Sequence, residues 1–237
     1  MVKRQAPLSQ PELDQLRESS DSLRERVYQY ITDAMAEGRL KPGEFLDQDP
    51  ICERFNVSKA PLRDALIRLE TEGFITIIPR RGIYINHTTV DFIKSAYQII
   101  GSLEADALDE VFHKLTPEHV RRFEESNARQ KIFLDSHDFA SYYKENIFFH
   151  NIFLTLSENR LIQGVIDPLR RRLYDFPRRC YAYEWEEVHL KQHERFIESV
   201  IVGNKVAAIS IFRFEHWSFE VHEPFLNSYY SFEKAKS

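Results

Sequence analysis

The sequence predicts a mainly α-helical protein in two parts: three helices with a two-stranded wing, followed by an all-α helical bundle. Residues 51–82 give, in order, a short helix, a turn, a second helix and a hairpin. Beyond Asn86 the alternating pattern of strands fades, and long segments with a 3.6-residue apolar period follow. Only seven glycines occur in 237 residues, which favours long helices. We therefore assign residues 23–86 to the first part and residues 87–237 to the second.

Residues 1–22 are polar and contain two prolines, so we expect a mobile N-terminal tail. No apolar leader and no long uncharged apolar run is present, which argues against a signal peptide and a membrane span. The two cysteines, Cys52 and Cys180, lie far apart and offer no disulfide framework. A cytoplasmic location is therefore expected.

The first part contains the signals of a helix-turn-helix. A helix that begins near Gln48 ends at Asn56, a residue type that tolerates left-handed backbone angles. Ser58 is the expected N-cap of the next helix, which runs from Lys59 to about Glu72 and stops before Gly73. Pro61 falls within its first turn, where a missing amide removes no helical bond.

The second helix has a buried side and a basic exposed side. At 100° per residue, Lys59 and Arg63 lie opposite the apolar stripe, and Arg68 lies about half a turn from Lys59, where a packing role is expected. A recognition helix contacts DNA chiefly through its N-terminal residues, so we place Lys59 and Arg63 on DNA and Ser58 on a phosphate. The predicted stripe consists of Leu62, Ala65, Leu66 and Leu69.

Residues 74–78 predict a strand, residues 79–82 its turn and residues 83–85 the returning strand. Arg80 and Arg81 at the tip suit a phosphate backbone or a narrow minor groove.

The chain carries a net charge of -5, so indiscriminate polyanion binding is not expected. Helix-turn-helix geometry also occurs in proteins that never touch nucleic acid, but the ordered set of features favours a DNA reader.

The strings GRLKPGEFL, NVSKAPLRDALIRLETEGFI and PRRG resemble the winged helix-turn-helix of the GntR transcription regulators. The resemblance implies DNA contacts at Ser58, Lys59 and Arg63, with Gly82 as the wing glycine. Lys59 replaces the more usual arginine and so lacks a planar bidentate fork. Asp49 stands where many members have a basic or neutral contact residue, and that contact is not carried over.

The second part contains six predicted helices, the last two separated by Gly203-Asn204. They cover about residues 89–113, 116–134, 139–156, 160–174, 185–202 and 205–225.

Histidines on these helices indicate a possible metal site. Asn146 and His150 are four residues apart on one helical face, and His193 and His216 lie on two later helices. A bundle interior would bring such side chains together, where neutral imidazoles can hold Zn or Ni. A lone histidine near an apolar face is more often a core residue, and His189 with His193 forms an alternative i, i+4 pair.

Residues from about 90 to 225 resemble the FCD effector domain of the FadR-type GntR branch, through SLEADAL, NIFFHNIFLTLSEN, QHERFIESV and AAISIFRFEHW. The resemblance implies a divalent metal ion, Zn or Ni, bound by Asn146, His150, His193 and His216. Asn146 replaces the family's aspartate, and its neutral amide should weaken metal binding. Ile100, four residues before Glu104, stands where many members direct an arginine toward an acidic effector.

Other arginines offer a replacement. The aromatic segment LYDFPRRCYAYEW is surrounded by Arg170, Arg171, Arg172, Arg178 and Arg179, and one or two of these could clamp the carboxylate of an effector. We take Arg171, Arg172 and Arg178 as the candidate effector contacts. The alternative is that most of them are surface charges.

The sequence thus predicts a ligand-responsive transcription regulator that binds double-stranded operator DNA. We expect a homodimer on a palindromic operator and a small organic acid as effector, with repression as the default and activation equally permitted. The alternative is a metal-dependent hydrolase or lyase that uses His150, His193 and His216 with Glu145 as base. Against that alternative, the chain contains no HExxH, phosphate-loop or Gly-rich cofactor motif.

Overall fold

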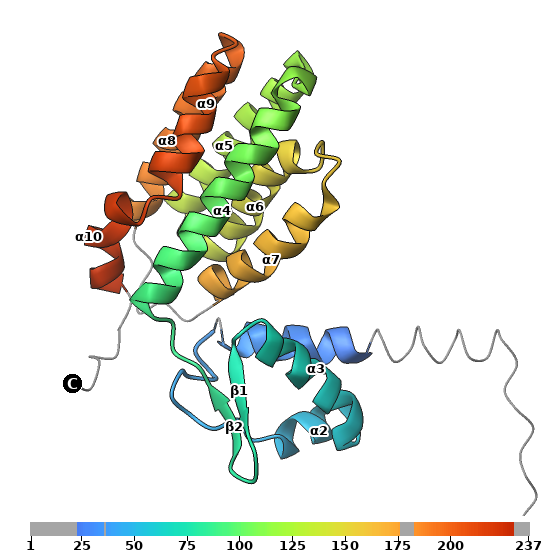
Figure 1. Ribbon diagram of the computed structural model, residues 1–237. Helices are drawn as coiled ribbons and strands as arrows, with labels where there is room; N and C mark the ends of the chain where they lie inside the picture. The colour runs from blue at the N-terminus through green and yellow to red at the C-terminus, as the bar shows by residue number, and fades with distance from the viewer. Residues whose placement is uncertain (1–22, 36, 176–182, 230–237) are drawn as a thin grey trace, which may run out of the picture. The chain divides into compact units, whose positions relative to one another are not determined.

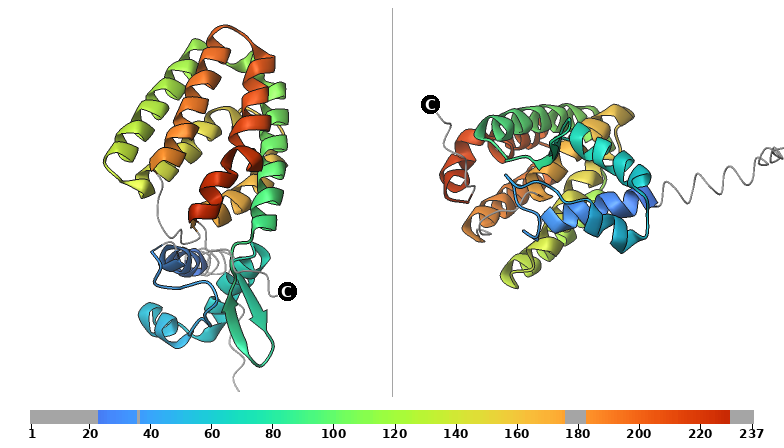
Figure 2. Two further views of the ribbon diagram at one scale, coloured as in Figure 1. Left: turned by 90° about the vertical axis from the view of Figure 1, so that its left-hand side faces the viewer. Right: turned by 90° about the horizontal axis from the view of Figure 1, so that it is seen from below.

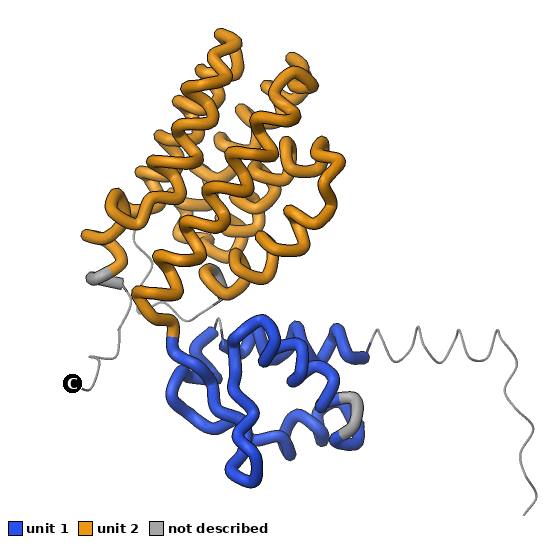
Figure 3. The backbone as a smooth tube through the Cα atoms, viewed as in Figure 1, with its two compact units in different colours: residues 1–87 blue, residues 88–237 orange. Residues whose placement is uncertain are grey.

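The computed structural model describes residues 23–35, 37–175 and 183–229. Two compact units divide between His87 and Thr88 (Figure 3). The first unit combines helices with a small sheet, whereas every element of regular secondary structure described in the second unit is a helix. The predicted fold class, mainly α with a wing and a separate bundle, is therefore confirmed.

The first unit is the predicted helix-turn-helix with a wing. A helix over residues 23–35 precedes α2 (Asp49–Phe55) and α3 (Lys59–Thr71). Asn56 adopts φ 49° at the end of α2, the left-handed conformation that the turn was expected to use. α3 turns its predicted apolar stripe into the core, where Leu62, Ala65, Leu66 and Leu69 are all buried.

The start of α3 differs from the prediction in one respect. Ser58 occupies the N-cap position with extended backbone angles, but its side chain makes no capping hydrogen bond. The third residue of α3 is Pro61, which lacks the amide that a serine cap commonly binds. The predicted capping bond of Ser58 is therefore wrong.

The wing consists of β1 (Ile75–Ile78) and β2 (Gly82–Ile85), paired antiparallel with Ile75 opposite Ile85. The amide of Arg81 donates to the carbonyl of Ile78 at 3.0 Å and closes the tip. Arg80 at this tip has φ 62°, which costs a non-glycine residue about 1 kcal/mol. Gly82 has φ 121°, a conformation that strongly favours glycine, so its role in the wing is one of backbone geometry.

The second unit is a helical bundle (Figures 1 and 2). In it α5 packs against α6 and α8, while α4 packs against α7, α9 and the π-helical segment η2. The predicted helices are present, most with ends shifted by one to three residues. The elements are α4 (Val90–Val111), η1 (Phe112–Lys114), α5 (Pro117–Asp135), α6 (Phe139–Leu154), α7 (Arg160–Asp175), α8 (Tyr183–Ile201), α9 (Lys205–Ile211), η2 (Phe212–His216) and α10 (Phe219–Tyr229).

The single helix predicted over residues 205–225 is instead three segments. α9 widens into the π-helical turn η2, and Trp217 then leaves the helical conformation at φ -106° and ψ 36°. Trp217 packs closely against α4 at Gly101. This approach requires a glycine, because a Cβ atom at residue 101 would stand 2.8 Å from the Cβ of Trp217. The break therefore depends on a packing contact between residues far apart in the sequence.

Gly101→Ala should destabilise the protein by about 1–3 kcal/mol, because the added methyl group overlaps a Cβ atom and not the flexible end of a side chain. Urea denaturation measures the change. Gly164→Ala in α7 is the matched control, since nothing lies within 4 Å of its Cβ position, and it should stabilise the helix by up to about 1 kcal/mol. Equal midpoints for the two variants would contradict the close approach of α4 and η2.

Candidate functional site

The N-terminal end of α3 carries the residues predicted to contact DNA. Ser58, Lys59 and Arg63 are all exposed, within the first two turns of the helix. Arg80 and Arg81 are exposed at the tip of the wing. The unbonded amides at a helix N-terminus and these cations are suited to phosphate oxygens.

Arg68, on the same helix, has a different role. Its guanidinium lies 3.8 Å from the ring centroid of Tyr28 and bonds to Glu72 at 3.0 Å. This arginine therefore packs the helix against the rest of the unit, as the sequence indicated.

Lys59 is paired within its own chain. Its ammonium lies 3.2 Å from a carboxylate oxygen of Asp49 on α2, and both side chains are at least 70% exposed. An exposed pair of this kind is weak and yields readily to a stronger partner such as a phosphate.

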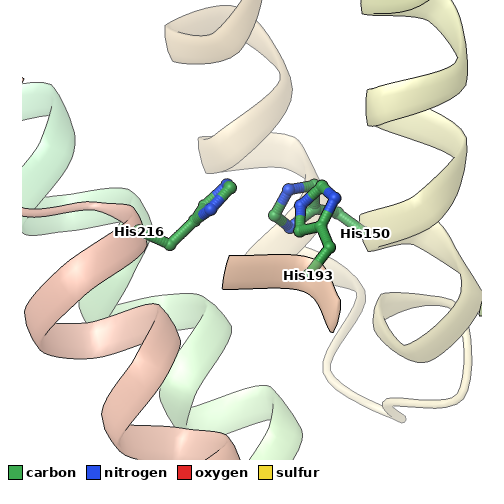
Figure 4. A group of neighbouring side chains, drawn as sticks. All are labelled: His150, His193 and His216. Carbon is green, nitrogen blue, oxygen red and sulfur yellow. The ribbon is translucent and has the colours of Figure 1, made fainter. Parts of the chain in front are cut away.

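The second candidate site is a group of three histidines inside the bundle. His150 comes from α6, His193 from α8 and His216 from η2 (Figure 4). One ring nitrogen from each lies within 4.8 Å of the other two. His150 and His193 are fully buried, and His216 is 2% exposed. The structure thus brings together three of the four predicted metal ligands.

Hydrogen bonds assign the proton on two of these rings. His150 Nδ1 donates to Glu104 Oε2 at 2.9 Å, and His216 Nδ1 donates to Gln192 Oε1 at 3.0 Å. Each ring therefore keeps its lone pair on Nε2. Among the described residues, His150 Nε2 and both ring nitrogens of His193 have no hydrogen-bond partner. Buried polar atoms of this kind are rare unless something binds them.

Burial favours the neutral form of all three rings. Burial lowers the pKa of His150, although the neighbouring Glu104 carboxylate opposes the shift. Burial, together with the other histidines, holds the pKa of His193 and of His216 well below the ordinary value. Since a metal ion binds only the unprotonated imidazole, these rings are in the required state at neutral pH.

Asn146 lies one helical turn before His150 on α6 and is 3% exposed. Its amide nitrogen donates to Gln130 Oε1 of α5 at 3.3 Å. Metal coordination by Asn146 stays a prediction.

Two further histidines lie close to the three but are differently engaged. His189 bonds through Nδ1 to Glu186 at 3.0 Å. His222 accepts from Trp185 Nε1 at 2.9 Å and donates through Nε2 to the carbonyl of His216 at 3.0 Å. Burial lowers the pKa of His222 to about 3, and with both nitrogens used this ring is structural. The spacing of His189 and His193 had suggested another site, but the structure groups His193 with His150 and His216.

Two family models match the chain. The model of bacterial regulatory proteins of the gntR family matches residues 23–85, and the FCD domain model matches residues 95–213. The chain belongs to the GntR family. It is a DNA-binding transcription regulator with an FCD domain, as the sequence predicted.

Curated relatives of this GntR regulator carry similar names. The HTH-type transcriptional regulator YdhC of Bacillus subtilis is 25% identical over 185 residues, which is 77% of this chain and 83% of that protein. The HTH-type transcriptional repressor RspR of Escherichia coli is 23% identical over 146 residues, or 62% of this chain and 64% of that protein.

Solved structures share the fold. Escherichia coli McbR/YncC has a TM-score of 0.69 at 17% identity, covering 87% of this chain and 98% of that one. A transcriptional regulator described as GntR from Rhodococcus sp. RHA1 also has a TM-score of 0.69, at 18% identity, covering 88% and 99%.

Membership of the GntR family sets aside the hydrolase or lyase alternative. The proposed base of that alternative, Glu145, bonds to Arg129 at 2.8 Å in this GntR regulator. None of the helices in the described ranges is long and apolar enough to cross a membrane.

Two of the three candidate effector arginines, Arg171 and Arg172, lie on α7. Arg171 and Arg172 are partly buried, and Arg172 lies 3.7 Å over the ring of Phe92; Arg178 lies outside the described residues. Arg170, one of the five arginines around the aromatic segment, is 1% exposed and paired with Glu104, a pairing that the sequence did not predict. Its burial could have been predicted, because residue 170 continues the buried stripe of Ile162 and Ile166 at intervals of four.

Asp49→Asn should raise the affinity of this GntR regulator for DNA by about 3- to 10-fold at low salt. The change removes a negative charge beside the phosphates and releases Lys59 from its pair. Fluorescence anisotropy with operator DNA across a salt series measures the effect. Glu53→Gln, at an exposed carboxylate of the same helix, is the control, and an equal gain in both variants would argue against a specific role of Asp49.

Proposed function

We propose that this GntR regulator is a cytoplasmic homodimeric repressor whose operator affinity responds to a small organic acid and a divalent metal ion. In this proposal the N-terminal end of α3 enters the major groove, where Ser58, Lys59 and Arg63 contact phosphates and bases. Arg80 and Arg81 of the wing contact the backbone or the minor groove, and Gly82 provides the wing turn. Two helix-turn-helix units related by two-fold symmetry imply a palindromic operator, because each unit binds one half-site.

The observation that carries the sensor proposal is the set of unbonded ring nitrogens in the interior. His150 Nε2 and both nitrogens of His193 have no hydrogen-bond partner within the described ranges, in a site where His216 also presents a neutral ring. Leaving such atoms unbonded costs about 1–3 kcal/mol each, whereas neutral imidazoles are preferred ligands of Zn²⁺ and Ni²⁺. His150, His193 and His216 would hold the ion, with Asn146 as the proposed neutral fourth ligand.

The arrangement of charges supports an acidic effector. Arg170 is the buried cation beside the site, and Glu104 already neutralises it. Three neutral histidines would leave a divalent ion with its full positive charge, which attracts a carboxylate more strongly than an exposed arginine does. Arg171, Arg172 and Arg178 stay candidates for further contacts to the effector.

Regulation would be a population shift. The acid would stabilise one conformation of the bundle, and that conformation would change the relative position of the two helix-turn-helix units in the dimer. The change in DNA affinity cannot exceed the ratio of the affinities of the acid for the two conformations.

Fluorescence anisotropy with DNA from upstream of the gene tests the proposal. The metal-loaded protein should bind with a Kd of about 10 nM or better at physiological salt and lose affinity steeply as salt rises. A panel of di- and tricarboxylates should include an acid that weakens binding, and removal of metal by a chelator should abolish that response. Binding that neither acids nor metal removal alters would refute the proposed sensor.

Asn146→Asp should tighten Zn²⁺ binding by about tenfold, because a carboxylate adds a negative charge to an otherwise neutral ligand set. A rotated Gln130 amide can donate to the new carboxylate, so the change should not leave a buried charge unbonded. Competition with a chromophoric chelator measures the affinity. Equal or weaker binding would remove Asn146 from the ligand set.

A further inference from the structure

Glu104 lies in the interior of the bundle with hydrogen-bond donors on both carboxylate oxygens. It is fully buried on α4. Its Oε2 accepts from His150 Nδ1 at 2.9 Å and from Trp217 Nε1 at 2.7 Å, and its Oε1 accepts from Arg170. These donors come from three different segments of the chain, so the carboxylate is held in one orientation.

The bond to His150 determines which nitrogen of that ring faces the site. With its proton on Nδ1 and directed to Glu104, the ring keeps a lone pair on Nε2, the atom without a partner in the described part of the chain. We propose that Glu104 is the positioning residue of the metal site: it sets the tautomer and orientation of His150 and raises the basicity of Nε2. The inference rests on the proposed metal site, and a carboxylate behind a ligating histidine is a common way to tune such a site.

The other two rings show why His150 would be the fixed ligand. His216 is bonded through Nδ1 to a neutral amide, that of Gln192. His193 is held by stacking on Phe149, with ring centroids 3.9 Å apart at 12°. Within the part of the chain that the structure describes, His150 is the one ring of the three that bonds to a carboxylate. A charged acceptor gives roughly twice the strength of a neutral one.

Arg170 and Trp217 complete the arrangement. Burial alone would raise the pKa of Glu104, but the charge of Arg170 and the hydrogen bonds from His150 and Trp217 hold that pKa below its ordinary value. The Arg170 guanidinium also cancels the charge of the carboxylate locally. Glu104 would therefore act on metal binding by orienting His150, while adding little net charge to the site.

The test compares Glu104→Gln with Glu186→Gln in the full-length protein. Glu186 is the matched control, because it is 2% exposed and bonds to His189 and Tyr143, outside the group of three. Glu104→Gln should weaken Zn²⁺ binding by about 10- to 100-fold in a chelator competition, whereas Glu186→Gln should stay within about threefold. Glu104→Gln/Arg170→Met removes both charges, should fold if the single variant does not, and should show the same loss.

A readout that needs no metal separates positioning from a structural role. Long-range ¹H–¹⁵N correlation of the metal-free protein should place the His150 proton on Nδ1 in the wild type and partly on Nε2 in the Glu104 variants. Wild-type Zn²⁺ affinity and an unchanged tautomer in the Glu104 variants would overturn the inference alone. A wild-type protein that binds no Zn²⁺ would overturn the proposed metal site and this inference together.

Discussion

Arg63→Ala should abolish sequence-specific DNA binding while leaving the fold intact. The side chain is exposed on α3, one turn after Lys59, and every core residue of the stripe lies on the opposite side. An arginine that contacts a base contributes about 1–3 kcal/mol, and the proposed homodimer would lose two such contacts. The predicted loss at an operator is therefore about 30-fold to more than 10⁴-fold, measured by anisotropy and footprinting.

Arg68→Ala on the same helix is the informative comparison. It removes the contact with the Tyr28 ring and the bond to Glu72, so the thermal midpoint should fall. The footprint of the folded fraction should be unchanged, because this side chain packs within the unit. A wild-type footprint for Arg63→Ala, or a lost footprint for Arg68→Ala at full folding, would contradict the assignment of the two faces of α3.

The helix-turn-helix could be predicted because its signals are local. Asn56 ends one helix, and the apolar stripe of α3 repeats within a dozen residues. Such features depend on backbone preference and side-chain spacing, which a sequence shows directly. The missing cap bond of Ser58 was also visible in principle, since Pro61 stands at the position of the absent amide.

The bundle shows where sequence-based prediction ends. The helices and the three histidines could be predicted from spacing and resemblance, but the break at Trp217 could not. It depends on the close approach of Gly101, more than a hundred residues earlier in the chain. A helical pattern through residues 205–225 contains no local sign of that contact.

The pairing of Glu104 with Arg170 was not predicted, for a related reason. Each continues a buried stripe of its own helix, Glu104 after Ile100 and Arg170 after Ile166. A charged residue in such a stripe is usually assigned to its edge, because burying one charge alone is costly. The pairing of the two across α4 and α7 helps to stabilise both positions, and single-helix periodicity carries no information on pairing.

His193→Ala should remove bound metal and the response to the acid, with little change in basal operator affinity. His193 lies on α8 in the second unit, and its two nitrogens have no hydrogen-bond partner in the described ranges. Loss of one of the three proposed histidine ligands should reduce metal affinity by more than about 100-fold, which exceeds the effect of altering a residue that only positions a ligand. Elemental analysis and chelator competition measure the loss.

Two further variants make the result specific. His193→Phe keeps an aromatic ring to stack on Phe149, so a loss of metal in this variant cannot be attributed to a cavity. His189 lies one turn earlier on the same helix and bonds to Glu186. The His189→Ala variant should therefore retain metal. Unchanged metal in His193→Phe, or equal loss in His189→Ala, would mean that the ion is held elsewhere and that the unbonded nitrogens of His193 have another explanation.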